Sequence, residues 1–193
     1  MKHKIASFIS TIGHPLFTIP VFVAIVMFMN EELKKASFIS FVIIGCIFLP
    51  LVLRMYLKSK NGTYTNFDVS DRVQRKSLFS FIIPILIVVT FILFKTHQNT
   101  NLCLSVLFAT ILVAISQIVN LFIKSSLHVS LNIYLSFLVM TLNFNAGIAL
   151  LLFTGLLGWS RIVLRRHTLK EVLTGGGVGL IIGLIMIYTE GYL

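Results

Sequence analysis

The sequence predicts an all-α integral membrane protein, a polytopic helical bundle of six to seven transmembrane helices. Of its 193 residues, 57% are hydrophobic and 11% are charged, and the mean hydropathy is +0.98. Soluble domains have roughly 45 to 50% apolar and about 25% charged residues, so this chain is expected to reside in a bilayer. Because apolar runs and short polar segments alternate along its whole length, we expect one membrane domain over residues 1–193.

Seven apolar runs give the expected helices in order. They cover residues 8–29, 37–57, 78–94, 102–123, 129–142, 146–157 and 172–188. A helix needs about 20 residues to cross the hydrocarbon core. The fifth and sixth runs are shorter than this and would have to recruit flanking polar residues. Asn143 to Asn145 separates those two runs and predicts a tight hairpin, while Pro50 is expected to kink the second run.

The last run carries Gly175, Gly179 and Gly183 at four-residue spacing. Small residues at this period let the backbones of two helices approach closely. We therefore expect the last helix to be packed centrally in the bundle.

Alternation of seven helices brings the amino terminus and the polar segments 58–76, 124–128 and 160–171 to one face. Thirteen of the 16 lysines and arginines then lie on this face, and three lie on the other, Lys34, Lys35 and Lys95. The positive-inside rule places the richly charged face in the cytoplasm. The formal charge of +10 does not indicate nucleic acid, since no basic and aromatic surface module is visible. Phosphorylated substrates and anionic lipid headgroups are the expected partners.

The polar segments on this face contain the residue types that bind phosphate. Arginine forks onto phosphate oxygens, lysine supplies a point charge and serine donates a hydroxyl. The predicted phosphate-binding residues are Arg72, Arg75, Lys124, Ser126 and Arg161.

Two histidines from different segments, His128 and His167, provide the pair that metal-free phosphoryl transfer needs. One attacks phosphorus and the other protonates the departing oxygen. Glu171 follows His167 by four residues, so on a helix it can orient the imidazole and stabilise its cation. The predicted catalytic residues are therefore His167, His128 and Glu171.

Several of these residues also have simpler interpretations. Thr168 and Glu171 form a capping-box pattern at the start of the last helix. Arg165, Arg166 and Lys170 are interpreted as interfacial anchors. Cys46 and Cys103 are read as packing residues, and His3, His14 and His97 as structural. The spacing of His167 and Glu171 fits a metal, but the surrounding cations would repel one, so no metal or cofactor is predicted.

At these residues the chain resembles the type-2 phosphatidic acid phosphatase family of membrane lipid phosphatases. The third motif of that family is Ser-Arg, five residues, His, three residues, Asp. It is matched by Ser160-Arg161, His167 and Glu171, with Glu in place of Asp. The second motif, Pro-Ser-Gly-His, is matched by Ser126 and His128.

The first motif of the family, Lys, six residues, Arg-Pro, is absent in its usual form. Asp71 to Arg75 before Pro84 looks like a diverged version, which carries over Arg72 and Arg75. The resemblance covers residues 71–183, and a helical hairpin separates the first two motifs that usually share one loop.

The resemblance implies a metal-independent, acid-phosphatase-type enzyme of a bacterial inner membrane that acts through a phosphohistidine on His167. Bacterial relatives act on undecaprenyl pyrophosphate, phosphatidylglycerol phosphate or lipid A phosphates, usually with the site outside the cytoplasm, whereas the charges here favour the cytoplasmic face. One alternative is a catalytically decayed relative that binds or transports lipids. Another is an isoprenoid transferase, which should show Asp-rich pairs for magnesium, and the six acidic residues form none that is convincing.

Overall fold

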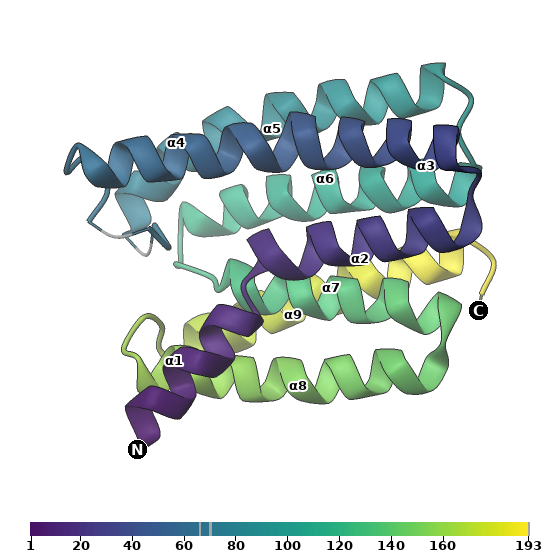
Figure 1. Ribbon diagram of the computed structural model, residues 1–193. Helices are drawn as coiled ribbons and strands as arrows, with labels where there is room; N and C mark the ends of the chain where they lie inside the picture. The colour runs from purple at the N-terminus through teal and green to yellow at the C-terminus, as the bar shows by residue number, and fades with distance from the viewer. Residues whose placement is uncertain (66, 70, 193) are drawn as a thin grey trace. The chain divides into compact units, whose positions relative to one another are not determined.

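The structure is a computed structural model that describes residues 1–65, 67–69 and 71–192. Every regular element in these residues is a helix, so the predicted all-α fold class is confirmed (Figure 1). Within the described residues, five helical segments are long and apolar enough to cross a membrane. A sixth span results if α1 (Lys2–Ile12) and α2 (Pro15–Asn30) count as one broken span. The chain is therefore an integral membrane protein.

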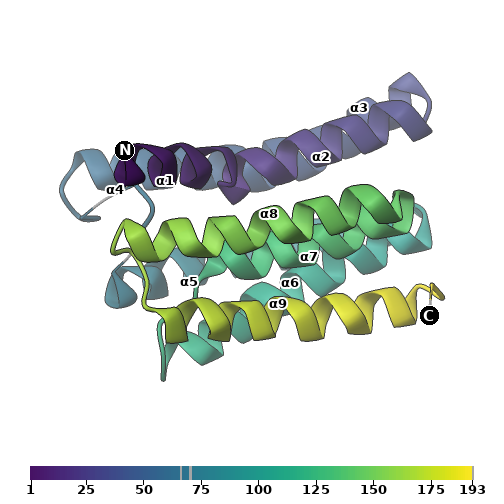
Figure 2. The same ribbon diagram turned by 90° about the horizontal axis from the view of Figure 1, so that it is seen from below.

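The helices form two compact units. Unit 1 comprises Met1–Pro15 and His97–Leu193, and unit 2 comprises Leu16–Thr96. Unit 1 contains α1, α6 (Thr100–Asn120), α7 (Leu127–Leu142), α8 (Phe144–Val163) and α9 (Leu169–Thr189). Within it, α7 packs along both α8 and α9, α1 packs on α8, and α6 packs on α9 (Figure 2).

The glycines of α9 permit its close approach to α7. A Cβ atom on Gly175 would lie 2.5 Å from the carbonyl oxygen of Ser126, and one on Gly179 would lie 2.5 Å from that of Ser130. No side chain fits at such distances from backbone atoms. The close helix approach that the glycine spacing predicted is confirmed, and its partner is α7. The expected central place of the last helix is not observed, since Leu173 and Ile181 of α9 are exposed.

The two short apolar runs become helices of different length. The helix of the sixth run, α8, has 20 residues because it extends beyond the apolar run through Ser160 and Arg161 to Val163. It is long enough to cross a membrane. The fifth run forms α7 with 16 residues, about 24 Å at 1.5 Å per residue. The polar side chains of Ser130, Asn132 and Ser136 on α7 are wholly buried, so α7 lies inside unit 1 as its central helix.

The hairpin between these helices is as tight as expected. A single residue, Asn143, separates α7 from α8, and its Oδ1 atom accepts a hydrogen bond from the backbone N–H of Ala146 at 2.9 Å. Asparagine at this position satisfies one of the amides that the first turn of a helix leaves unpaired.

The first apolar run is not one continuous helix. The prediction of a single helix over residues 8–29 is wrong, because α1 ends at Ile12 and α2 begins at Pro15. A residue that precedes proline is disfavoured in the α region, and this applies to His14. The break lies at Gly13 and His14, and these two residues therefore form a bend rather than a helix interior.

In unit 2, α3 (Leu33–Ser40), η1 (Phe41–Phe48) and α4 (Leu49–Lys60) form one continuous helical segment of 28 residues. The π-helical turns of η1 come just before Pro50, which cannot donate a backbone hydrogen bond. A turn then leads to α5 (Arg72–Lys95), and Asp71 caps α5 by accepting from the amides of Val73 and Gln74 at 2.9 Å each. The predicted helix start at Asp71 is confirmed.

Candidate active site

The turn that follows α8 brings His167 back beside Arg161. Arg165 adopts a left-handed φ of 54°, which ends the helix. The amides of Arg166 and His167 then both donate to the carbonyl oxygen of Arg161, at 3.0 and 3.2 Å. Two of the predicted site residues are therefore held together by backbone bonds.

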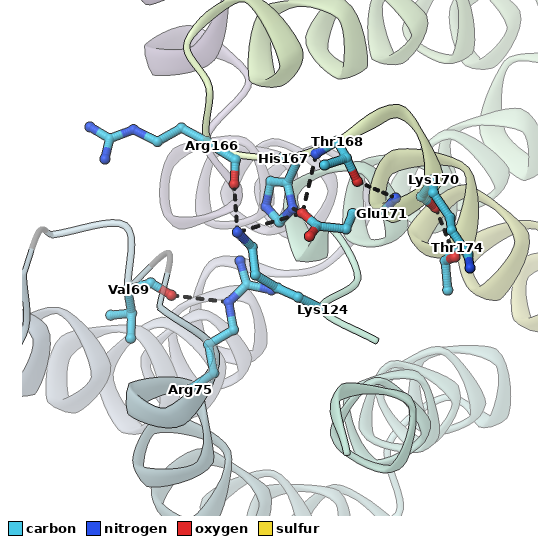
Figure 3. Close-up of polar contacts among 9 residues, drawn as sticks. All are labelled: Val69, Arg75, Lys124, Arg166, His167, Thr168, Lys170, Glu171 and Thr174. Atoms are coloured by element: carbon cyan, nitrogen blue, oxygen red, sulfur yellow. Dashed lines mark hydrogen bonds and ion pairs between the residues drawn. The ribbon is translucent and has the colours of Figure 1, made fainter. Parts of the chain in front are cut away.

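His167 is oriented by Glu171. The imidazole is fully buried, and its Nδ1 atom lies 2.9 Å from Oε2 of Glu171 (Figure 3). A carboxylate accepts hydrogen bonds, so Nδ1 is the donor and the ring keeps its lone pair on Nε2. In this tautomer Nε2 is the nucleophilic atom.

The same carboxylate belongs to the cap of α9. The amide of Thr168 donates to Oε2 of Glu171 at 3.2 Å, and the amide of Glu171 donates to Oγ1 of Thr168 at 3.3 Å. The predicted capping box is thus confirmed, and it coexists with the contact to His167. One side chain both starts the helix and orients the ring.

Lys124 and Ser126 attach the α6–α7 turn to this cluster. The ammonium of Lys124 donates to the carbonyl of Arg166 at 2.8 Å and lies 3.5 Å from Oε2 of Glu171 (Figure 3). The amide of Ser126 donates to the carbonyl of Glu171 at 3.1 Å. The ammonium competes with any metal ion for that carboxylate, which favours an anion as the ligand of the site.

Ser126 stands at the amino terminus of α7 with its hydroxyl buried. The residue is fully inaccessible and does not cap the helix with its side chain. Within the part of the chain that the structure describes, its Oγ atom has no hydrogen-bond partner. Helix amino termini attract anions, because their amides and the helix dipole both present positive charge. The start of α7 therefore offers a hydroxyl and backbone N–H groups to an anion.

Arg161 places a positive charge inside unit 1. Its side chain is 0% exposed, and Nη1 donates to the hydroxyl of Ser10 on α1 at 2.8 Å. A guanidinium in a site of low dielectric interacts strongly with phosphate oxygens, to which it can donate two parallel hydrogen bonds. Arg161 is therefore positioned by α1 as well as by its own helix.

His128 contacts a residue that the sequence pattern did not single out. Its ring meets the ring of His14 edge to face, with centroids 4.5 Å apart and planes at 81°. The side-chain amide of Asn132 donates both to the carbonyl of Gly13, at 2.9 Å, and to that of His128, at 2.7 Å. The bend after α1 is thereby fixed against the first turns of α7.

Three residues of the site were thus missed: Ser10, His14 and Asn132. The sequence held one signal for them, a His-Pro pair in the middle of an apolar run, but nothing in its spacing linked that pair to the later motifs.

Arg72 and Arg75 belong to unit 2. Arg72 is exposed, whereas Arg75 is buried and its Nε atom donates to the carbonyl of Val69 at 3.0 Å (Figure 3). Val69 has a φ of 46°, a conformation that is costly for a β-branched residue. Arg75 therefore fastens a strained turn, and its part in phosphate binding stays a prediction, as does that of Arg72.

Five of the eight predicted residues are joined by these contacts in unit 1, where the α6–α7 and α8–α9 turns meet. They are Lys124, Ser126, Arg161, His167 and Glu171. His128 follows Ser126 by two residues in the same unit, and its ring contacts His14. The arrangement combines an oriented imidazole, a second histidine, two cations and a buried hydroxyl. Comparisons with protein-family models, with curated proteins and with solved structures found no match to this chain.

Proposed function

We propose that the chain is an integral membrane phosphatase that hydrolyses a lipid phosphate monoester or diphosphate through a phosphohistidine on His167. The observation that carries this proposal is the 2.9 Å contact between Nδ1 of His167 and Oε2 of Glu171. This contact leaves the lone pair of the ring on Nε2. The backbone amide of His167 also donates to the carbonyl of Arg161, whose side chain is buried.

The proposed reaction has two steps. Nε2 of His167 attacks phosphorus, the bond from phosphorus to the lipid oxygen breaks, and the imidazolium of His128 gives its proton to the departing oxygen. Glu171 stabilises the positive charge that develops on the ring of His167. Water then attacks the phosphohistidine while His128 takes a proton from it, and inorganic phosphate leaves with the ring of His167 regenerated.

The anion is bound by the groups around the two histidines. Arg161 and Lys124 supply positive charge, and Ser126 with the first amides of α7 supplies hydrogen-bond donors. This chemistry proceeds without a metal ion, because the charge of the phosphoryl group is met by protein cations.

The membrane setting supports a lipid as the substrate. Undecaprenyl pyrophosphate and phosphatidylglycerol phosphate are the substrates that the resemblance to the lipid phosphatase family implies, with the isoprenoid or acyl chain lying between helices. The distribution of lysine and arginine favours a site on the cytoplasmic face of a bacterial inner membrane.

The decisive experiment measures phosphate release from these lipids by the detergent-purified protein in the presence of EDTA. Wild type should release phosphate, and His167→Ala should abolish release while retaining the elution volume and melting temperature of wild type. His3→Ala is the matched control, because His3 is exposed on α1. Equal, low release by wild type and His167→Ala would instead support a protein that binds or transports lipids. Turnover that requires magnesium would support a transferase.

A further inference from the structure

Unit 2 carries a second polar cluster that the proposed reaction does not use, in which two cations of α4 meet Ser77 in the first turns of α5. The guanidinium of Arg54 donates through Nη2 to the hydroxyl of Ser77 at 2.9 Å and to its carbonyl at 3.3 Å. The ammonium of Lys58 lies 3.4 Å from the same hydroxyl, and the hydroxyl of Tyr64 lies 3.3 Å from it. Two cations and a hydroxyl group therefore converge on one neutral oxygen.

This convergence leaves two charges without a counter-charge. The oxygen of Ser77 is neutral, so it accepts hydrogen bonds from both cations without offsetting their charge. Arg54 and Lys58 are four residues apart on one helical face, where like charges repel. Within the described residues neither cation has a carboxylate partner, and Nε of Arg54 is buried without a hydrogen-bond partner. An anion next to Ser77 would neutralise both charges.

An apolar groove begins at these cations. It is about 320 Å³ in volume and is lined by Pro50, Leu53, Arg54, Leu57, Lys58 and Phe81. The guanidinium of Arg54 stacks on the ring of Phe81 at 4.4 Å from its centroid, which holds the charge at one edge of the groove. A ligand that fits has a negatively charged head and a hydrocarbon tail.

The location in the chain selects the ligand. Lys58 and Lys60 lie in the last turn of α4, at the end of a candidate membrane span, where lysine and arginine meet lipid headgroups. Each such cation near the surface attracts anionic lipids by about 1 kcal/mol. We propose that Arg54, Lys58, Tyr64 and Ser77 bind the phosphate of an anionic phospholipid, with an acyl chain along Leu53, Leu57 and Phe81. This site does not depend on the proposed phosphatase activity.

Native mass spectrometry of the detergent-purified protein, titrated with phosphatidylglycerol or phosphatidylethanolamine, tests the proposal. Wild type should retain phosphatidylglycerol at least several-fold more strongly than phosphatidylethanolamine. The double variant Arg54→Gln, Lys58→Gln should reduce the retention of phosphatidylglycerol on the order of tenfold. Lys60→Gln removes the same type of charge two residues away, outside the groove, and should change retention less than twofold. The single variant Lys58→Gln, at a half-buried residue, keeps the test informative if the double variant misfolds. It should lose less retention of phosphatidylglycerol than the double variant and more than Lys60→Gln.

Three outcomes would overturn the proposal. Equal retention of the two lipids would show that charge does not select the ligand. An equal loss in Lys60→Gln would show a general attraction to the basic helix end rather than a site. Displacement of phosphatidylglycerol by millimolar inorganic phosphate would show that the groove contributes nothing to binding.

Discussion

Nδ1 of His167 and Oε2 of Glu171 are 2.9 Å apart, and that oxygen also accepts the backbone N–H of Thr168. The first turn of α9 and the orientation of the candidate nucleophile are therefore set by one atom. Because His167 directly precedes Thr168, the cap residue of α9, and contacts Glu171 in its first turn, the start of α9 cannot rotate without turning the imidazole. Oε2 of Glu171 also lies 3.5 Å from the ammonium of Lys124.

Replacing Glu171 by Gln should separate these two functions. The amide oxygen of Gln can still accept the N–H of Thr168, so the melting temperature should change by less than about 3 °C. The neutral side chain cannot stabilise the imidazolium of His167, so kcat should fall on the order of 100-fold or more. Lipid phosphatase kinetics and thermal unfolding check this, with Thr174→Val as the control on the same helix. A variant with wild-type kcat would assign Glu171 to helix capping alone.

His14 is predicted to be a positioning residue for His128. Replacing it by Ala removes the ring that meets His128 edge to face, and loss of this support should lower kcat by about 10- to 100-fold with KM nearly unchanged. His14→Phe restores an aromatic edge but not the nitrogen atoms. Recovery of kcat in His14→Phe would mean that the ring of His14 supports His128 by packing alone. Loss of kcat in both variants would mean that a nitrogen atom of His14 is required. His3→Ala, at an exposed residue of α1, is the control, and full activity of His14→Ala would refute the prediction.

Gly175 and Gly177 form a matched pair on α9. A Cβ on Gly175 would lie 2.5 Å from the oxygen and 2.9 Å from the nitrogen of Ser126, whereas a Cβ on Gly177 meets nothing within 4 Å. Gly175→Ala should therefore push the start of α7 away, at a cost of about 1–3 kcal/mol in the free energy of unfolding, and should lower phosphatase activity. Gly177→Ala should leave activity unchanged and favour the helix by about 0.5–1 kcal/mol. Equal effects of the two substitutions on melting temperature and turnover would contradict the packing described here.

The helical bundle could be predicted from the sequence because its cause is local. Apolar runs of about 20 residues specify spans directly, and the glycine period of α9 specified a close neighbour, although not that the neighbour is α7. The capping box at Thr168 and the cap at Asp71 are also local patterns. The alternation of helices predicted that segments 124–128 and 160–171 share a face, and the bonds from Lys124 to Arg166 and from Ser126 to Glu171 show that these two turns meet.

The contribution of α1 could not be predicted, since it depends on contacts between residues far apart in sequence. The bond from Arg161 to Ser10 joins residues 151 positions apart, and that from Asn132 to Gly13 joins residues 119 apart. Serine and asparagine are common in membrane helices as packing residues, so their types carry no signal. The split of the first run was also missed, because hydropathy reports apolarity and does not register the φ and ψ limits before Pro15.

Glu190, just beyond the end of α9, gives a prediction about pH. Its Oε1 accepts a hydrogen bond from the hydroxyl of Ser105 at 2.9 Å, and burial raises the pKa of this carboxyl above its ordinary value of 4.5, an effect that the bond to Ser105 partly offsets. The folded state therefore binds this proton more tightly than the unfolded state, so stability decreases as pH rises from 4.5 through the folded pKa. Glu190→Gln stays neutral and keeps an acceptor for Ser105, so at pH 7 it should raise the melting temperature by roughly 1–2 °C, a small effect because solvent screens a half-buried group. Below pH 4 the variant and wild type should have the same melting temperature.

Thermal unfolding in detergent between pH 4 and 8 checks this prediction, with Glu32→Gln at an exposed residue as the control. A difference in melting temperature that does not vary with pH would refute the assignment.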